Sequence, residues 1–375
     1  MIGEHMRALP TAAADAVSGA LRVSVVISVH NSSSTLGEVL AALRRSRLNA
    51  HLYELIVVDD ASTDSSVAVS ARYADTVVKL KGRRGPAYAR NRGVEQARGD
   101  IIVFVDDDVV VRPDTLSRMI GVLLERRDID AVSASRDERA GARNFASRYW
   151  NVLQRFGEQR YQGRCANFAP GCGAVRRDTF IAAGMYDEWR FGSACIENLE
   201  FGERLLRAES GVLLSSELKV THLKKWDIRS IGRELWRRGG ILTRSLGYLR
   251  MNAAAPGDVV FTLSRALIPA VALFSTLMLA AAVVPQPRLA AKTFLALVVL
   301  LITNVPMHRF YARTEGIAFA LLAAPLHIVA QSVAAVALCS GWILRDVFGD
   351  LSPDAATQAY AEVGLDIWPP VPRKL

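Results

Sequence analysis

Three adjacent carboxylates, Asp106, Asp107 and Asp108, directly follow the apolar run from Ile101 to Val105. That run is rich in β-branched residues, which is typical of a buried strand. Neighbouring like charges repel, so something must neutralise them. A solvated turn is one explanation, because aspartate favours turns. A divalent-cation site is the other, because open α/β sheets bind ligands at the carboxyl ends of their strands.

The elements that would position these acids follow from the alternation between residues 23 and 124. Four strand-like segments, VSVVISVH, YELIVVDD, DTVVKLK and DIIVFVDDD, are separated by segments with helical spacing of apolar residues. Serines precede the first helical segment, and Pro86 lies near the first turn of the third. The pattern predicts an α/β fold with a mostly parallel, doubly wound sheet. No G-x-G-x-x-G follows the first strand, which argues against a dinucleotide site.

The composition changes near residue 258. Hydrophobic residues make up 51% of the 375-residue chain, and residues 259–284, 289–305 and 316–344 form three apolar segments in succession. Buried core helices would explain any one of them, but three in a row predict transmembrane helices. The third segment either crosses the membrane or turns back at Pro325.

The basic flank of these segments predicts their orientation. Residues 233–250 are rich in arginine, and short arginine-rich loops stay on the cytoplasmic side. We therefore expect a multi-pass protein of the cell membrane with a cytoplasm-facing catalytic region. Trp226, Arg233 and Trp236 are candidate contacts to the membrane or to a substrate located at it. With a net charge of +9 beside membrane segments, lipid headgroups are better partners than nucleic acid.

Two further features bear on the cellular compartment. The first twenty residues lack a continuous apolar core, so we expect no secretory signal there. The four cysteines show no C-x-x-C spacing, which supports neither a zinc ribbon nor a redox motif.

Four segments in this order resemble the family 2 glycosyltransferases of the GT-A fold: VSVVISVHNSSSTL, ELIVVDDASTDSS, GPAYARNRGVEQARGDIIVFVDDDV and GCGAVRRDTFIAAGMYDE. The resemblance covers roughly residues 22 to 225. It implies transfer of a sugar from a UDP-, GDP- or dTDP-linked donor, usually with inversion and usually with Mg²⁺ or Mn²⁺. A site of few carboxylates completed by substrate phosphates suits Mg²⁺.

The resemblance also implies roles for particular residues. The nucleotide-sugar site would contain Ser28, Val29, His30, Asp60, Arg90, Asp106 and Asp107, with Asp60 at the nucleobase. Asp106, Asp108 and His222 would hold the metal, Asp106 lying near the ribose or the metal. For Arg90 and Asn91 a solvated helix surface is the alternative.

The catalytic base is where the chain departs from the family. The family usually reads Glu-Asp at this point, with the aspartate as general base, but this chain has Glu197 and Asn198. An amide cannot accept a proton at neutral pH, so Glu197 or Glu200 must substitute, or the acceptor is already anionic. The alternative for Glu197 is favourable electrostatics at a helix N-terminus.

These observations predict six regions. They are an N-terminal extension (1–21), a nucleotide-sugar-binding half (22–130), an acceptor-binding half (131–228), a basic interfacial region (229–257), about three transmembrane helices (258–345) and a tail (346–375). The expected function is metal-dependent glycosyl transfer to a lipid-linked or surface-glycan acceptor at the membrane. The alternatives are a polyprenyl-phosphate glycosyltransferase and a nucleotide-sugar-binding assembly protein without catalysis.

Overall fold

A computed structural model describes residues 22–160, 163–164, 168, 171–189, 197–249 and 286–348. They belong to two compact units. The first unit holds the described residues up to Asp137 and those from Tyr161 to Leu223. The second holds Glu138–Arg160 and the described residues from Lys224 onward. Residues 138–160, expected in the acceptor-binding half, therefore group with the C-terminal helices.

The first unit is built on one sheet, which has nine strands within the described residues. They are β1 (Val23–Val29), β2 (Tyr53–Asp59), β3 (Thr76–Lys79), β4 (Ile101–Val105), β5 (Val109–Val111), β6 (Ala131–Arg136), β7 (Gly163–Arg164), β8 (Cys172–Arg176) and β9 (Val212–His222). Their order is β3-β2-β1-β4-β8-β6-β9-β5, with β7 paired to β9. The sheet thus places the ends of β1, β2 and β4 side by side.

The direction of pairing changes at β4. The ladders β3–β2, β2–β1 and β1–β4 are parallel, as predicted. Beyond β4, the strand β8 pairs antiparallel with both β4 and β6, while β6 and β9 are parallel. Parallel neighbours need a crossover connection, which helices supply between the first four strands. The α/β expectation is confirmed, and the sheet as a whole is mixed.

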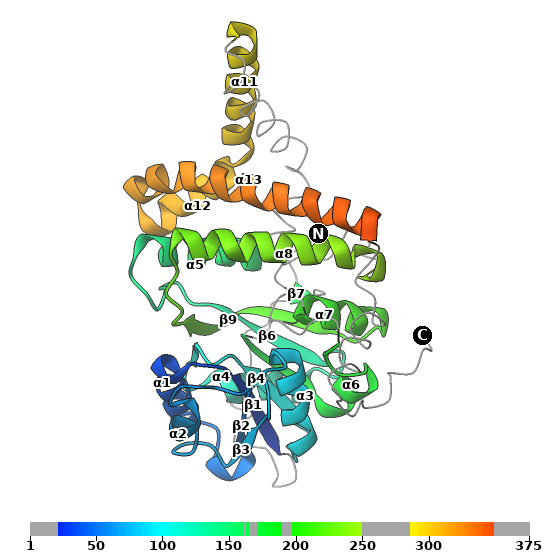
Figure 1. Ribbon diagram of the computed structural model, residues 1–375. Helices are drawn as coiled ribbons and strands as arrows, with labels where there is room; N and C mark the ends of the chain where they lie inside the picture. Colours follow the sequence, from blue (N-terminus) through cyan, green and yellow to red (C-terminus); the bar gives the residue numbers. More distant parts are fainter. Residues whose placement is uncertain are drawn as a thin grey trace. The chain divides into compact units, whose positions relative to one another are not determined.

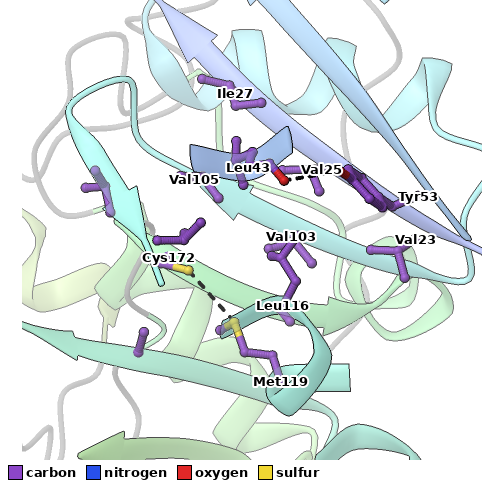
Figure 2. Close-up of a cluster of buried hydrophobic side chains, with 14 of the residues drawn as sticks. Val23, Val25, Ile27, Leu43, Tyr53, Val103, Val105, Leu116, Met119 and Cys172 are labelled. Atoms are coloured by element: carbon purple, nitrogen blue, oxygen red, sulfur yellow. Dashed lines mark hydrogen bonds between the residues drawn. The ribbon is translucent and has the colours of Figure 1, made fainter. Parts of the chain in front are cut away.

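Helices cover both faces of this sheet (Figure 1). They are α1 (Ser33–Arg44), α2 (Ser66–Ser70), α3 (Pro86–Gln96), α4 (Thr115–Glu125), α6 (Arg177–Ala182) and α7 (Glu197–Arg207), with the short 3₁₀ helix η2 at Ala50–Leu52. Val25 of β1 packs in one core with residues of α1 and α4, and the next residue, Val26, packs in the other core with residues of α3. Figure 2 shows part of the first core, including the Tyr53 hydroxyl that donates to the Leu43 carbonyl at 3.1 Å. Burial on both faces explains the continuous apolar runs in the sequence.

The second unit is helical in its described part. It contains α5 (Phe145–Arg160), α8 (Ile228–Leu249), α11 (Pro287–Thr303), α12 (Val305–Glu315) and α13 (Ile317–Phe348). Tyr149 of α5 stacks on Tyr311 of α12 with ring centroids 5.7 Å apart. The helices α8 and α13 approach closely at Gly239, where a Cβ atom would lie 2.8 Å from the Cβ of Ala337.

Buried polar side chains tie these helices together. Asn304, at the break between α11 and α12, exchanges two amide hydrogen bonds of 2.9 and 3.0 Å with Gln331 of α13. His327 of α13 lies 3.2 Å from the Asn304 Oδ1 and 3.1 Å from the Tyr149 hydroxyl. Each buried polar group in this cluster therefore has a partner, as burial away from water requires.

Of the predicted membrane segments, the first, residues 259–284, lies outside the described residues. Among the described helices, Ile317–Gly341 is long and apolar enough to cross a bilayer, with a mean hydropathy of 1.9. The helices Ala290–Thr303 and Val305–Glu315 are bent by 55° relative to each other. They are long and apolar enough to cross a bilayer only if the two count as one span. The most apolar part of Ile317–Gly341 is 44% buried. Core helices of soluble proteins can be equally long and apolar, so membrane crossing stays a prediction.

Candidate active site

Three strand ends meet at the carboxyl edge of the parallel part of the sheet. The Asp60 amide, just beyond β2, donates to the carbonyl of Val29 at the end of β1 over 2.8 Å. The His30 Nδ1 lies 2.7 Å from the Asp60 carbonyl oxygen. The parallel β1–β4 ladder directs the acidic turn after β4 toward the same edge. This is the edge at which open α/β sheets bind ligands.

Asp60 is fixed by backbone donors. Its two carboxylate oxygens accept hydrogen bonds from the amides of Arg84 (2.6 Å) and Gly85 (2.8 Å). Gly85 has a φ of 91°, which a residue with a side chain rarely adopts. The loop before α3 thereby holds a 3%-exposed carboxylate in one orientation. Each of its oxygens keeps a second lone pair that a nucleobase could use.

The residues at the end of β1 differ in what they can offer. Ser28 is half-buried, whereas the Val29 side chain is buried in the core next to α1. Only the backbone of Val29 can therefore contact a nucleoside. His30 is half-buried, with its ring anchored to the Asp60 carbonyl.

The three acids after β4 do not share one environment. Asp106 is paired with an arginine, while Asp107 accepts a hydrogen bond from the Ser32 hydroxyl at the start of α1. Burial raises the pKa of the Asp107 carboxyl to about 6, against the lowering effect of the Ser32 hydrogen bond. The Asp108 carbonyl accepts from the amide of Leu223 at 2.7 Å. Asp106 and Asp107 thus have different partners, although the charge of Asp106 still contributes to the raised pKa of Asp107.

His222 joins the acidic turn through the sheet. It is the last residue of β9 and lies opposite Val109, the residue after Asp108. A Cβ atom at Gly171 would lie 3.0 Å from the His222 Nε2 and 3.7 Å from the Asp106 Oδ2. The missing side chain of Gly171 thus leaves room between an imidazole nitrogen and a carboxylate oxygen. Gly171 is the first residue of the GCGAV segment, but the sequence gives no signal for its place beside the acidic turn.

The residues around Gly171 supply only some of the ligands that a bound cation needs. Among the described residues, no three His, Cys, Asp or Glu side chains are arranged to hold a metal ion by themselves. Mg²⁺ and its analogues commonly use one or two carboxylates together with substrate phosphates. The room beside Gly171, with Asp106 and His222 facing it and Asp108 next in the turn, fits a site of that kind.

Arg90 lies on the inner side of this site. Its side chain is 5% exposed, and its two terminal nitrogens bind Asp106 Oδ1 at 2.8 Å and Glu197 Oε1 at 3.0 Å. Its guanidinium carbon is 5.6 Å from the centroid of the Tyr186 ring. Burial lowers the pKa of Arg90, but the carboxylates of Asp106 and Glu197 outweigh burial and leave it above the ordinary value.

Asn91, the neighbour of Arg90, is also buried. Its side-chain amide donates to the Tyr186 carbonyl at 2.9 Å and to Glu188 at 2.7 Å, and its oxygen accepts from the Tyr186 amide. The alternative of a solvated helix surface is therefore wrong for both residues. They join α3 to the segments around residues 186 and 197.

The two candidate bases are both held by arginines. Glu197, the first residue of α7, is 2% exposed and pairs with Arg90. Glu200 is 1% exposed, and both of its oxygens accept from Arg204 at 2.6 and 2.8 Å. Asn198 is half-buried and thus more accessible than either glutamate. Neither glutamate therefore presents its carboxylate to solvent.

The candidate acceptor and membrane residues belong to the helical unit. Trp226 is 9% exposed, and its ring lies 5.0 Å from that of Trp150. Arg233 is exposed, and Trp236 is 51% exposed on α8. Of the two tryptophans, only Trp236 offers its ring to a membrane or an acceptor.

Comparison with known proteins gives this geometry a family. Residues 24–183 match the model described as Glycosyl transferase family 2. Residues 24–183 are therefore similar to the family 2 glycosyltransferases. The match spans β1 to α6 and includes the acidic turn, Arg90 and Gly171, whereas Glu197 and His222 lie beyond it.

Two curated relatives match the N-terminal part of this chain. An uncharacterized glycosyltransferase of Haemophilus influenzae is 34% identical over 109 residues, which is 28% of this chain and 42% of the relative. A dodecaprenyl-phosphate galacturonate synthase of Rhizobium johnstonii is 29% identical over 126 residues, covering 32% and 37%. The chain thus spans less than half the length of either relative.

A solved structure shows the same fold. It is a mannosyltransferase from Pyrobaculum calidifontis in complex with GDP-Man and Mn²⁺. The two chains align with a TM-score of 0.58 and 21% identity over 82% of this chain and 88% of the other. This likeness supports the GT-A fold expected from the sequence.

Proposed function

We propose that the protein transfers a sugar from a nucleotide-sugar donor to an acceptor, with the aid of Mg²⁺ or Mn²⁺. The observation that carries this proposal is the group of side chains around Gly171, where Asp106 Oδ2 and His222 Nε2 face the same small space. That group lies at the ligand-binding edge of a family 2 glycosyltransferase domain.

The residues at this edge divide into two roles. Asp60 and the backbone around Ser28, Val29 and His30 hold the nucleoside. Asp106, Asp108 and His222 hold the cation, which when bound neutralises charge on the leaving diphosphate. Asp107 faces the start of α1 and shapes the turn instead of binding the donor directly.

The acceptor that the geometry favours is an anion, such as a polyprenyl phosphate. Glu197 and Glu200 are both buried and committed to arginines, and the accessible residue between them is the amide Asn198. A phosphate oxygen is already ionised at neutral pH and needs no general base. The relative named as a dodecaprenyl-phosphate galacturonate synthase is consistent with this acceptor class. A hydroxyl acceptor would instead require Glu197 to leave its partner Arg90.

The membrane is the natural location for such an acceptor. The apolar helices α11 and α13 would anchor the chain in the cell membrane with the transferase domain facing the cytoplasm. Exposed apolar side chains on α11, among them Phe294 and Leu295, support this anchor. The partners are then a nucleotide sugar, a lipid-linked acceptor and membrane lipids, and no nucleic acid is expected.

The test is release of free nucleotide. The full chain, in detergent with Mn²⁺, would be given UDP-, GDP- and dTDP-linked sugars, each with a short polyprenyl phosphate, with a glycolipid bearing only hydroxyls, or with no acceptor. We expect release that depends on the polyprenyl phosphate and stops with EDTA. Release only with the glycolipid would overturn the anionic acceptor. Donor binding without release under any condition would identify a binding protein that has lost catalysis.

A further inference from the structure

Arg90 connects two acids that belong to different parts of the site. It lies on α3, and its two terminal nitrogens reach Asp106, just after β4, and Glu197, the first residue of α7. A planar guanidinium can donate to two carboxylates in a fixed geometry, which a lysine ammonium cannot reproduce. The bridge therefore links the start of α7 to the acidic turn.

The bridge also gives the two carboxylate oxygens of Asp106 different surroundings. Oδ1 is held by Arg90 at 2.8 Å, whereas Oδ2 faces the room beside Gly171. Because one oxygen is fixed, the plane of the carboxylate is fixed, and Oδ2 is presented toward the side of His222. A cation would meet this oxygen without first having to order the side chain.

Glu197 keeps this arrangement attractive to a cation. Arg90 and Asp106 alone would form a neutral pair, but a second carboxylate gives the trio a formal charge of minus one. Burial strengthens these interactions, because Arg90 and Glu197 have side chains that are only 5% and 3% exposed. Arg90 is therefore poorly placed to bind the donor itself, since both of its terminal nitrogens are engaged and its surface is covered.

We propose that Arg90 is a positioning residue that orients Asp106 for the cation and uses Glu197 as its counter-charge. This inference rests on the proposed metal-dependent function and changes two expected roles. Arg90 acts through Asp106 and not on the nucleotide sugar, and Glu197 acts through Arg90 and not as a base. Groups that orient a metal ligand in this way typically change metal affinity 10- to 100-fold when they are replaced.

The test measures cation affinity directly. Mn²⁺ would be titrated into the full chain in detergent, in separate series with saturating UDP, GDP and dTDP. Free Mn²⁺ would be followed by electron paramagnetic resonance. Arg90→Lys keeps the positive charge but loses the planar guanidinium with its two terminal nitrogens. We expect it to weaken Mn²⁺ binding about 10- to 100-fold. UDP, GDP or dTDP binding without metal should change less than about threefold, since Arg90 does not touch the nucleotide. The matched control is Arg126→Lys, at an exposed ion pair with Asp128, which should leave both affinities unchanged.

The Glu197→Gln variant distinguishes a role of Glu197 as counter-charge of Arg90 from a role as general base. The amide can still accept from Arg90, so we expect weaker Mn²⁺ binding with little change in kcat at saturating Mn²⁺. In the double variant Arg90→Lys, Glu197→Gln, the loss of Mn²⁺ affinity should be smaller than the product of the single losses, because the two residues act together.

The outcomes are distinct. Wild-type Mn²⁺ affinity in Arg90→Lys, with a chain that melts cooperatively, overturns the positioning role. So does a nucleotide affinity that falls as much as the Mn²⁺ affinity. A kcat loss of about 10²- to 10⁴-fold in Glu197→Gln at saturating Mn²⁺ identifies a general base and overturns the counter-charge role. If the wild-type chain binds no Mn²⁺ with any of the three nucleotides, the metal-dependent function itself fails.

Discussion

The backbone amide of Leu223 donates to the carbonyl oxygen of Asp108 over 2.7 Å. This hydrogen bond extends the antiparallel ladder of β5 and β9, in which His222 lies opposite Val109. It brings the end of a strand from the C-terminal part of the first unit beside the acidic turn. Because the bond uses main-chain atoms only, it survives any change to the Asp108 side chain.

Asp108→Ala should therefore abolish transfer without unfolding the chain. Loss of a metal ligand removes several kcal/mol of transition-state stabilisation, so we expect turnover to fall at least about 10²- to 10³-fold. Turnover with Mn²⁺ and the thermal melting curve would be measured together. Asp128→Ala, at an exposed acid paired with Arg126, is the control and should keep full activity. Full activity of Asp108→Ala, or no effect of EDTA on the wild type, would remove Asp108 from the metal site.

Asn198→Asp should slow transfer to a polyprenyl phosphate. A new carboxylate at this half-buried position would repel the anionic acceptor. Like charges 4 Å apart repel by about 1 kcal/mol even in water, so KM should rise at least about fivefold. For a hydroxyl acceptor the same change would supply a base and raise kcat. Steady-state kinetics with both acceptors, and Asn198→Gln as the uncharged control, decide between them. A higher kcat with the polyprenyl phosphate would contradict the anionic-acceptor proposal.

Glu54→Gln should weaken the first unit in a pH-dependent way. Glu54 accepts from the Ser24 hydroxyl at 2.7 Å and from Arg98 at 2.7 and 2.9 Å, joining β1, β2 and the segment before β4. Burial raises the pKa of the Glu54 carboxyl, but the hydrogen bonds from Arg98 and Ser24 outweigh it and leave the pKa below 4.5. Its stabilising contribution is thus present above pH 4.5 and lost as pH falls through the lower folded pKa.

Urea unfolding of the wild type and of Glu54→Gln at a series of pH values tests this prediction. At pH 7 we expect the variant to lose about 1–3 kcal/mol of unfolding free energy, since hydrogen bonds to a charged group contribute that much. The gap between variant and wild type should close as pH falls below 4.5. Glu95→Gln, at a 38%-exposed carboxylate, is the matched control and should have little effect. A gap that does not change with pH would contradict the assignment.

Two lysines on α11 should weaken membrane retention of the chain if this helix lies in the bilayer. Phe294 and Leu295 are 67% and 64% exposed, and lysine at the centre of a membrane helix costs about 3 kcal/mol. We expect Phe294→Lys, Leu295→Lys to lower the fraction of protein retained in the pellet after alkaline carbonate extraction, while α13 still holds part of it. The control substitutes lysine at Ile181 and Leu206, which are 44% and 48% exposed in the first unit. Equal retention of both double variants would show that α11 is not the anchor.

The sequence by itself determined the parallel half of the fold and the edge at which its acids gather. Alternating apolar runs and helical spacing specified β1 to β4 with their crossover helices. The acids at 60 and 106–108 follow strand ends directly, and parallel strands bring their carboxyl ends together. Such signals are local, so adjacency along the chain was enough to find them.

Only the tertiary structure decided what these residues contact. Arg90 and Glu197 are 107 residues apart, and their pairing depends on how α3 and α7 pack on the same face of the sheet. The antiparallel β8 brings Gly171 beside the acidic turn, where its missing side chain makes room for Asp106 and His222. A charged residue in a sequence can be solvated or paired, because burial and distance determine which state has the lower free energy. Neither quantity is encoded in the spacing of residues along the chain.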